Sequence, residues 1–326
     1  VDLFFVLSGY LIASPLFSAI AANQRLGVPE FFIKRSFRIL PAYLCILAIY
    51  FFIPYAREWE GLAPAWKYLT FTQNIGLDLL TQRTFSHAWS LCIEEQFYLL
   101  FPFLLLALRY GKLLSKGAVI LLLLFAANFF CRYYCYTRIV MPHFDADDGW
   151  WYWYRWIYYP TFCRLDGLLT GVTLAALFTF KPKIKAWTDK RGNLFLLSGI
   201  ALLTVAYFVC SKQDSFAGAV YGFSLVSLGY GALLASAVSK QSLLFKYNLK
   251  FSSVIAALSY SVYLSHKIII HITQDQFSKL NIKRDGTWMF LICCVSCLLG
   301  AMLLRWMVER PFLKWRDVLL NKIKER

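Results

Sequence analysis

Side chains that could carry proton-transfer chemistry are concentrated in residues 86–98, directly before a long apolar run. The candidates are His87, Ser90, Glu94, Glu95 and Tyr98. In a continuous helix, His87, Ser90 and Glu94 would share one face, and Tyr98 would follow Glu94 by one turn. Ionisable groups at the mouth of a membrane span are costly, which favours a functional site over an interfacial cap with a structural Glu94 pair.

The composition indicates a polytopic membrane protein. Of 326 residues, 59% are hydrophobic and 16% are charged, whereas soluble domains carry about 25% charged residues. A membrane span needs about 20 apolar residues. About nine such segments are predicted, at 1–21, 37–55, 88–108, 117–136, 157–180, 193–210, 216–238, 252–273 and 287–308. The predicted fold class is an all-α transmembrane helical bundle, with residues 1–326 forming one integral-membrane domain.

The charge pattern predicts the orientation of this bundle. The net charge is +16, but the basic residues fall in short tracts between apolar segments, which argues against nucleic-acid binding. Alternate connections are rich in Lys and Arg, including residues 181–191 and 310–326, and these are expected in the cytoplasm. The opposite set contains the acidic residues Asp145, Asp147 and Asp148. The C-terminus is therefore predicted to be cytoplasmic.

Two other patterns have simple interpretations. The nine cysteines show no framework spacing and are expected to be small core residues, with neither disulfides nor a metal site. The outer connection at about 137–156 is crowded with Trp and Tyr. An interfacial aromatic belt is the preferred interpretation, and sugar binding by ring stacking is the alternative.

Three ionisable residues are predicted to lie at one depth in the membrane. Glu94 and Arg164 each lie seven residues inside the outer end of their segments, and His266 lies seven residues before the outer end of its own. At 1.5 Å per residue, each is about 10 Å deep. Because an isolated buried charge is expensive, we expect a shared polar cavity in which Glu94 pairs with Arg164. A structural ion pair without chemistry is the alternative.

The motif His-x-Trp-Ser-Leu-x-x-Glu-Glu-Gln-Phe-Tyr-Leu at 87–99 resembles the signature of the membrane acyltransferase 3 family. The resemblance continues along the chain, in residues 1–12, 31–43, 164–171, 258–266 and 308–312. It implies a ten-span bacterial inner-membrane enzyme that moves an acyl group, most often acetyl, from cytoplasmic acyl-CoA to an extracytoplasmic carbohydrate. Lipopolysaccharide O-antigen and exopolysaccharide are examples of such acceptors.

The resemblance also suggests roles for individual residues. The candidates for the general base are His87, with Glu94 orienting it, and a His on the family's first span. Arg164 could stabilise charge on the thioester oxygen. Tyr98 and Ser90 are possible acyl relays. Glu95 and His266 complete the catalytic set. On the inner side, guanidinium groups match phosphate geometry, so the donor acyl-CoA is expected near Lys34, Arg35 and Arg38, although these residues could instead contact lipid.

One family feature has no counterpart in this sequence. The family's first span carries an Arg and, ten residues later, a His, whereas this sequence opens on residues that resemble the second span. We therefore expect a chain that lacks the first helix, and a C-terminus without a soluble domain. A transporter or flippase without a covalent step is the rival function, because its midplane charges would look similar. A non-enzymatic partner protein is a third possibility.

Overall fold

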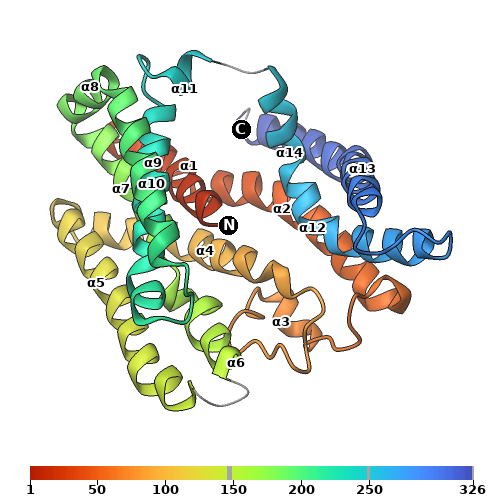
Figure 1. Ribbon diagram of the computed structural model, residues 1–326. Helices are drawn as coiled ribbons and strands as arrows, with labels where there is room; N and C mark the ends of the chain where they lie inside the picture. Colours follow the sequence, from red (N-terminus) through yellow and green to blue (C-terminus); the bar gives the residue numbers. More distant parts are fainter. Residues whose placement is uncertain (145–148, 248–249, 325–326) are drawn as a thin grey trace. The chain divides into compact units, whose positions relative to one another are not determined.

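The computed structural model describes residues 1–144, 149–247 and 250–324, and it confirms the all-α fold class (Figure 1). Throughout these ranges the regular elements are helices, without a β-strand. The acidic residues Asp145, Asp147 and Asp148 of the predicted outer connection lie outside the described residues.

Among the residues that the structure describes, eight helical segments are long and apolar enough to cross a membrane. They contain α1 (Asp2–Ala21), α2 (Val28–Phe52), α4 (Trp89–Tyr110), α5 (Gly117–Cys135), α9 (Gly192–Val209), α10 (Phe223–Ala237), α12 (Lys250–Ser278) and α13 (Thr287–Leu304). Each corresponds to a predicted span, although α2 begins nine residues before the predicted start. The chain is therefore a multi-pass membrane protein.

The continuous span predicted at 157–180 is wrong. Aromatic residues form α6 (Gly149–Trp153) and a π-helical turn (Tyr154–Tyr158), and the extended Pro160 then interrupts the helix. Helix α7 begins only at Asp166 and ends at Phe180. At 1.5 Å per residue its 15 residues cover about 22 Å, less than the roughly 30 Å of a hydrocarbon core. Arg164 consequently precedes this helix instead of lying seven residues inside it.

The chain divides into two compact units, and each is described by itself. The first comprises Val1–Leu26, Ala65–Leu79 and Trp89–Asn248, and it contains α1, α3 (Ala65–Leu69), α4 to α10 with α8 (Pro182–Lys190), and α11 (Leu243–Lys246). The second comprises Gly27–Pro64, Leu80–Ala88 and Leu249–Arg326, with α2, α12, α13 and the terminal helix α14 (Arg310–Lys324).

Helices α1 and α7 form the most closely packed pair of the first unit (Figure 1). Small residues make this possible. A Cβ on Gly9 would overlap the Leu168 carbonyl, and one on Gly171 would overlap the Val6 carbonyl and the Tyr10 amide. Residues 166–172 of α7 are all buried. The backbone contact therefore fixes the height of α7 along α1, and with it the residues just before α7.

Replacing Gly171 with leucine should separate α1 from α7, because the obstructing atoms belong to the backbone and cannot rotate away. Overpacking usually costs about 1–3 kcal/mol, and we expect a loss at or above the upper end of that range. Thermal unfolding of the purified chain in detergent measures the effect. Gly117→Leu is the control, since a Cβ there meets nothing within 4 Å. Equal melting temperatures for the two variants would contradict this packing.

Candidate functional site

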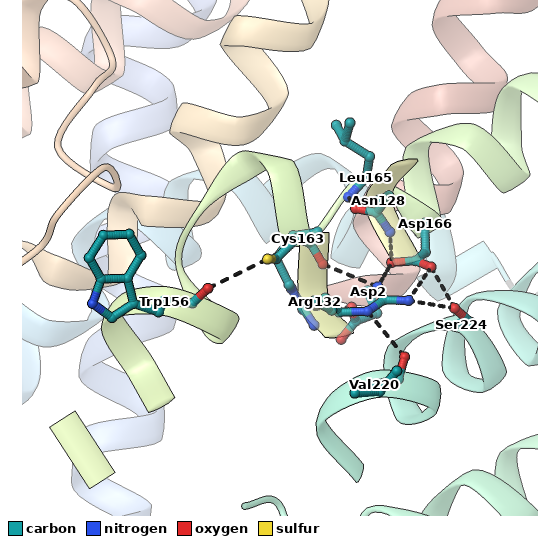
Figure 2. Close-up of polar contacts among 10 residues, drawn as sticks. Asp2, Asn128, Arg132, Trp156, Cys163, Leu165, Asp166, Val220 and Ser224 are labelled. Atoms are coloured by element: carbon teal, nitrogen blue, oxygen red, sulfur yellow. Dashed lines mark hydrogen bonds and ion pairs between the residues drawn. The ribbon is translucent and has the colours of Figure 1, made fainter. Parts of the chain in front are cut away.

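A fully buried arginine connects three helices of the first unit (Figure 2). Arg132 of α5 forms a two-pronged ion pair with Asp166, the first residue of α7. Its remaining donors reach Ser224 Oγ on α10 at 2.8 Å, and the Cys163 and Val220 carbonyl oxygens at 3.1 Å. Asp166 also accepts hydrogen bonds from Ser224 and Asn128. With every nitrogen satisfied, Arg132 has the environment of a structural residue.

Arg164, two residues before Asp166, is also buried but is only partly satisfied. Its Nη2 lies 2.7 Å from Asp2 Oδ1, at the start of α1. Its Nε and Nη1 are buried and have no hydrogen-bond partner among the residues that the structure describes. The guanidinium carbon lies 3.8 Å from the centroid of the Phe223 ring and 5.1 Å from that of Tyr158. Two donor nitrogens thus remain available inside an aromatic enclosure.

The predicted ion pair between Arg164 and Glu94 is wrong. Arg164 takes Asp2 as its partner, and Glu94 Oε2 accepts hydrogen bonds from Ser8 Oγ at 2.7 Å and Tyr98 Oη at 2.5 Å. The prediction failed because it assumed a continuous helix through Pro160. The sequence pattern of residues 1–12 also gives no sign that Asp2, at the start of α1, reaches another segment.

Helix α1 nevertheless contacts both charged sites of the first unit. Asp2 holds Arg164, Phe5 packs edge-on against Trp89 of α4, and Ser8 holds Glu94. The six residues from Asp2 to Ser8 correspond to about 9 Å of helix. The guanidinium and the carboxylate are therefore held at two levels along α1, from positions about 120° apart around its axis.

Gln96 has a positioning role that the sequence motif did not reveal. Its Nε2 donates to the Phe71 carbonyl at 2.6 Å and to Asn74 Oδ1 at 3.0 Å, and its Oε1 accepts from Thr161 at 2.6 Å. Asn74 in turn donates to Thr161 and to the Tyr159 carbonyl. These bonds attach the non-helical segment before Arg164, which contains Tyr159 and Thr161, to α4.

The remaining motif residues on α4 are less exposed than a surface cap would require. Ser90 and Tyr98 are buried, and Glu95 is half-buried. His87 lies in a 3-10 turn (Ser86–Ala88), and α4 begins at Trp89. The predicted common α-helical face therefore includes Ser90 and Glu94 but not His87.

The second unit brings His87 next to His266 of α12. Their ring centroids lie 4.9 Å apart, at an interplanar angle of 71°. His266 Nδ1 is 2.8 Å from the Tyr263 carbonyl, which requires a proton on Nδ1 and leaves Nε2 as the basic nitrogen of the neutral ring. His87 Nε2 lies 3.4 Å from the Leu264 carbonyl, whereas its Nδ1 is buried without a partner within the described ranges.

The turn that carries His87 is backbone-strained. Phe85 is completely buried and has a φ of 56°, a left-handed conformation that is unusual for a bulky residue. Its ring lies 5.1 Å from that of His87 and 4.8 Å from that of Tyr50 on α2. Tyr263 donates a hydrogen bond to the His87 carbonyl at 2.5 Å. Tight packing on both sides therefore holds the imidazole in place.

The predicted donor-binding residues lie in the first turns of α2. Lys34 forms an exposed ion pair with Glu30 at 2.8 Å, Arg35 is half-buried and Arg38 is exposed. Arg35 and Arg38 follow Lys34 by one and four residues, so the three side chains occupy neighbouring positions near the start of α2. At the other end of the chain, Arg305 pairs with Glu309 at 3.6 Å, as the helical spacing predicted. Over the described ranges, no group of three or more His, Cys, Asp or Glu side chains could hold a metal.

The two buried arginines should differ in their effect on stability. Arg132→Met leaves Asp166 buried with too few donors, and we expect a loss of about 3–5 kcal/mol. Arg164→Met should cost less, because the Asp2 side chain is 26% exposed and water can solvate it. Thermal unfolding in detergent compares the variants. Asp2→Asn, but not Glu94→Gln, should recover stability in the Arg164→Met background. Recovery with Glu94→Gln instead would contradict the assigned pairing.

The comparisons with known proteins agree with the motif. A family model described as "Acyltransferase domain" matches residues 1–306. O-acetyltransferase OatA of Staphylococcus aureus (strain NCTC 8325 / PS 47) is 31% identical over 83% of this chain and 45% of its own length. Peptidoglycan O-acetyltransferase OatA of Listeria monocytogenes is 28% identical over 96% of this chain and 51% of its own.

The chain thus spans about half the length of these curated relatives. An uncharacterized protein of Haemophilus influenzae is 27% identical over 64% of this chain and 86% of its own length. No solved structure matches significantly. Because the family match covers almost the whole sequence, the chain belongs to the acyltransferase 3 family of membrane proteins.

Proposed function

We propose that this chain transfers an acetyl group from acetyl-CoA to a hydroxyl group of an extracytoplasmic glycan. The family match over residues 1–306 carries this proposal. The printed name of the Listeria relative contains peptidoglycan, so we favour peptidoglycan as the acceptor over lipopolysaccharide O-antigen or exopolysaccharide. The family match also favours a covalent transfer over a transporter or flippase.

The reaction needs a base, a stabiliser of negative charge and a leaving group. The acceptor oxygen attacks the thioester carbonyl carbon, and its proton passes to the base. The carbon–sulfur bond then breaks, and CoA leaves as a thiolate that takes up a proton. Negative charge develops on the carbonyl oxygen during the attack, so donors that are preorganised and shielded from water are the most effective stabilisers.

Arg164 is our candidate for this stabilising role. Two of its nitrogens lack partners among the described residues, and its guanidinium is held by Asp2 and by the Phe223 ring. A donor that is already positioned and dehydrated costs no reorganisation when charge develops. Arg132, whose five donors are all used, offers no such capacity.

We assign the proton-handling roles within each unit. In the first unit, Ser8 and Tyr98 fix the Glu94 carboxylate, which could accept the proton of an attacking hydroxyl. A covalent acyl relay on Tyr98 would use this carboxylate as the proton acceptor. Ser90 is a weaker relay candidate, and Glu95 has no assigned step.

In the second unit, the neutral His87 ring retains a basic Nδ1 if Nε2 carries the proton. His87 therefore remains a candidate base, with His266 packed beside it.

The orientation and the donor site are also proposals. The basic asymmetry of the connections favours a bacterial inner-membrane protein with a cytoplasmic C-terminus. With this orientation, the start of α2 faces the cytoplasm, where Arg35 and Arg38 could bind the phosphates of acyl-CoA, together with Lys34. Guanidinium groups bind phosphates through two parallel hydrogen bonds, which an ammonium cannot do, so we expect the arginines to contribute more than Lys34.

Glu94→Gln should abolish most transfer while preserving the fold, because the amide keeps the shape but removes the charge. We expect a fall in the acetylation rate of about 10²–10⁴-fold, the range of general acid–base contributions. Tyr98→Phe and Ser8→Ala should each cost about tenfold, since each removes one hydrogen bond to the carboxylate. The rate is measured as the transfer of labelled acetyl from acetyl-CoA to the glycan. Exposed Glu60 provides the control Glu60→Gln. Near-normal transfer by Glu94→Gln would show that Glu94 is structural.

A further inference from the structure

The first unit contains a cavity that the reaction proposed above does not use. It has a volume of about 210 Å³ and lies between the aromatic segment of residues 149–158 and the connection before α10. Its lining includes Phe144, Trp150, Trp153, Tyr154, Gln213 and Asp214. Pockets that enclose drug-sized ligands typically measure about 300–1,000 Å³. This cavity therefore suits a single ring, with the rest of a larger ligand outside.

The aromatic lining has both an exposed and a buried component. Trp150 is 49% exposed, whereas Trp153 is only 5% exposed. The Trp153 indole nitrogen is buried, yet it finds no hydrogen-bond partner in the part of the chain that the structure describes. Buried Trp N–H groups usually have an acceptor. The Trp153 indole N–H at the wall of the cavity is thus a hydrogen-bond donor without an acceptor among the described residues.

The polar lining matches a polyol better than a lipid headgroup. Gln213 and Asp214 are exposed, and Tyr136 anchors the Asp214 backbone carbonyl at 3.0 Å, which leaves the carboxylate itself for other contacts. A carboxylate accepts hydrogen bonds from hydroxyl groups but repels phosphate. The site therefore combines aromatic faces, one buried donor, one amide and one acceptor. Sugar rings present apolar C–H faces and hydroxyls that both donate and accept.

The cavity also lies close to Arg164 through a continuous chain of rings. Trp153 lies 5.3 Å from Tyr158 and 6.5 Å from Phe223, measured between ring centroids. Phe223 and Tyr158 in turn enclose the Arg164 guanidinium. Two layers of packed rings therefore connect the cavity wall to the proposed site of negative charge. A glycan with one ring in the cavity would therefore need to extend past these rings for another of its hydroxyls to reach the Arg164 site.

We propose that this cavity is a subsite for one saccharide ring of the acceptor glycan, with Trp150 stacking on the ring and Trp153, Gln213 and Asp214 bonding to its hydroxyls. The inference rests on the proposed function and orientation, which place the cavity on the outer side of the membrane. It also differs from the interfacial aromatic belt favoured by the sequence pattern, because a belt explains neither the buried Trp153 nor Asp214.

The test uses the full chain in nanodiscs and a tetrasaccharide of alternating N-acetylglucosamine and N-acetylmuramic acid as the probe. Trp150→Ala should raise both the Kd and the KM for the probe about tenfold or more, as for truncation of a central aromatic contact. Asp214→Asn should act in the same direction. The kcat at saturating probe and the Kd for acetyl-CoA should not change. Trp66→Ala is the matched control, since Trp66 is 58% exposed in the same unit but does not line the cavity.

The outcomes separate this inference from the proposed function. If Trp150→Ala and Asp214→Asn bind the probe as the unmodified chain does, while Glu94→Gln loses transfer, the subsite is wrong and the function stands. If the two variants bind weakly but the unmodified chain transfers no acetyl, the function is wrong and the subsite stands. If Trp150→Ala alters only membrane insertion, the aromatic belt explains these residues. A chain that does not bind the probe at all also overturns the subsite.

Discussion

The cost of burying positive charge among apolar helices controls the architecture of the first unit. Arg132 recovers the lost hydration through Asp166, Ser224 and two backbone carbonyls. These partners lie in α7, in α10 and in the turns directly before those two helices. The arginine therefore joins elements that are distant in sequence. A charge that is fully bonded in this way is expensive to disturb, since removing one partner strands the other. The network also fixes where α7 begins.

This fixed position gives Arg164 its unusual environment. The two arginines differ in chemistry, although both are almost completely buried. Every nitrogen of Arg132 has an acceptor, whereas two nitrogens of Arg164 have no partner among the residues described. Rings of Phe223 and Tyr158 surround it and exclude water, while Asp2 orients one end. Such incomplete satisfaction is rare in structural arginines and is what a group that binds a developing charge requires.

The sequence was sufficient for the fold class and the family, since long apolar segments and contiguous motifs do not depend on tertiary detail. Eight predicted spans match helical segments of the described residues, because the chain stays helical along each of them even where a π-helical or 3-10 turn is included. The sequence failed at Arg164, where Pro160 and a π-helical turn break the helix and invalidate depth counted in residues. It also missed Arg132, Asp2 and Ser8, whose importance comes only from partners 34 to 162 positions away. The hydrogen bond from Ser8 on α1 to Glu94 on α4 leaves no periodic pattern in the sequence.

The proposed function requires that acetyl cross the membrane by covalent transfer and not by transport of a finished product. Proteoliposomes with the C-terminal face outward, verified by protease access to a terminal tag, test this most directly. Labelled acetyl-CoA is supplied outside, and the glycan is enclosed inside. The account predicts labelled ester on the enclosed glycan and free CoA outside, in equal amounts. Release of unmodified glycan, or ester formation only when donor and acceptor share one side, would contradict it.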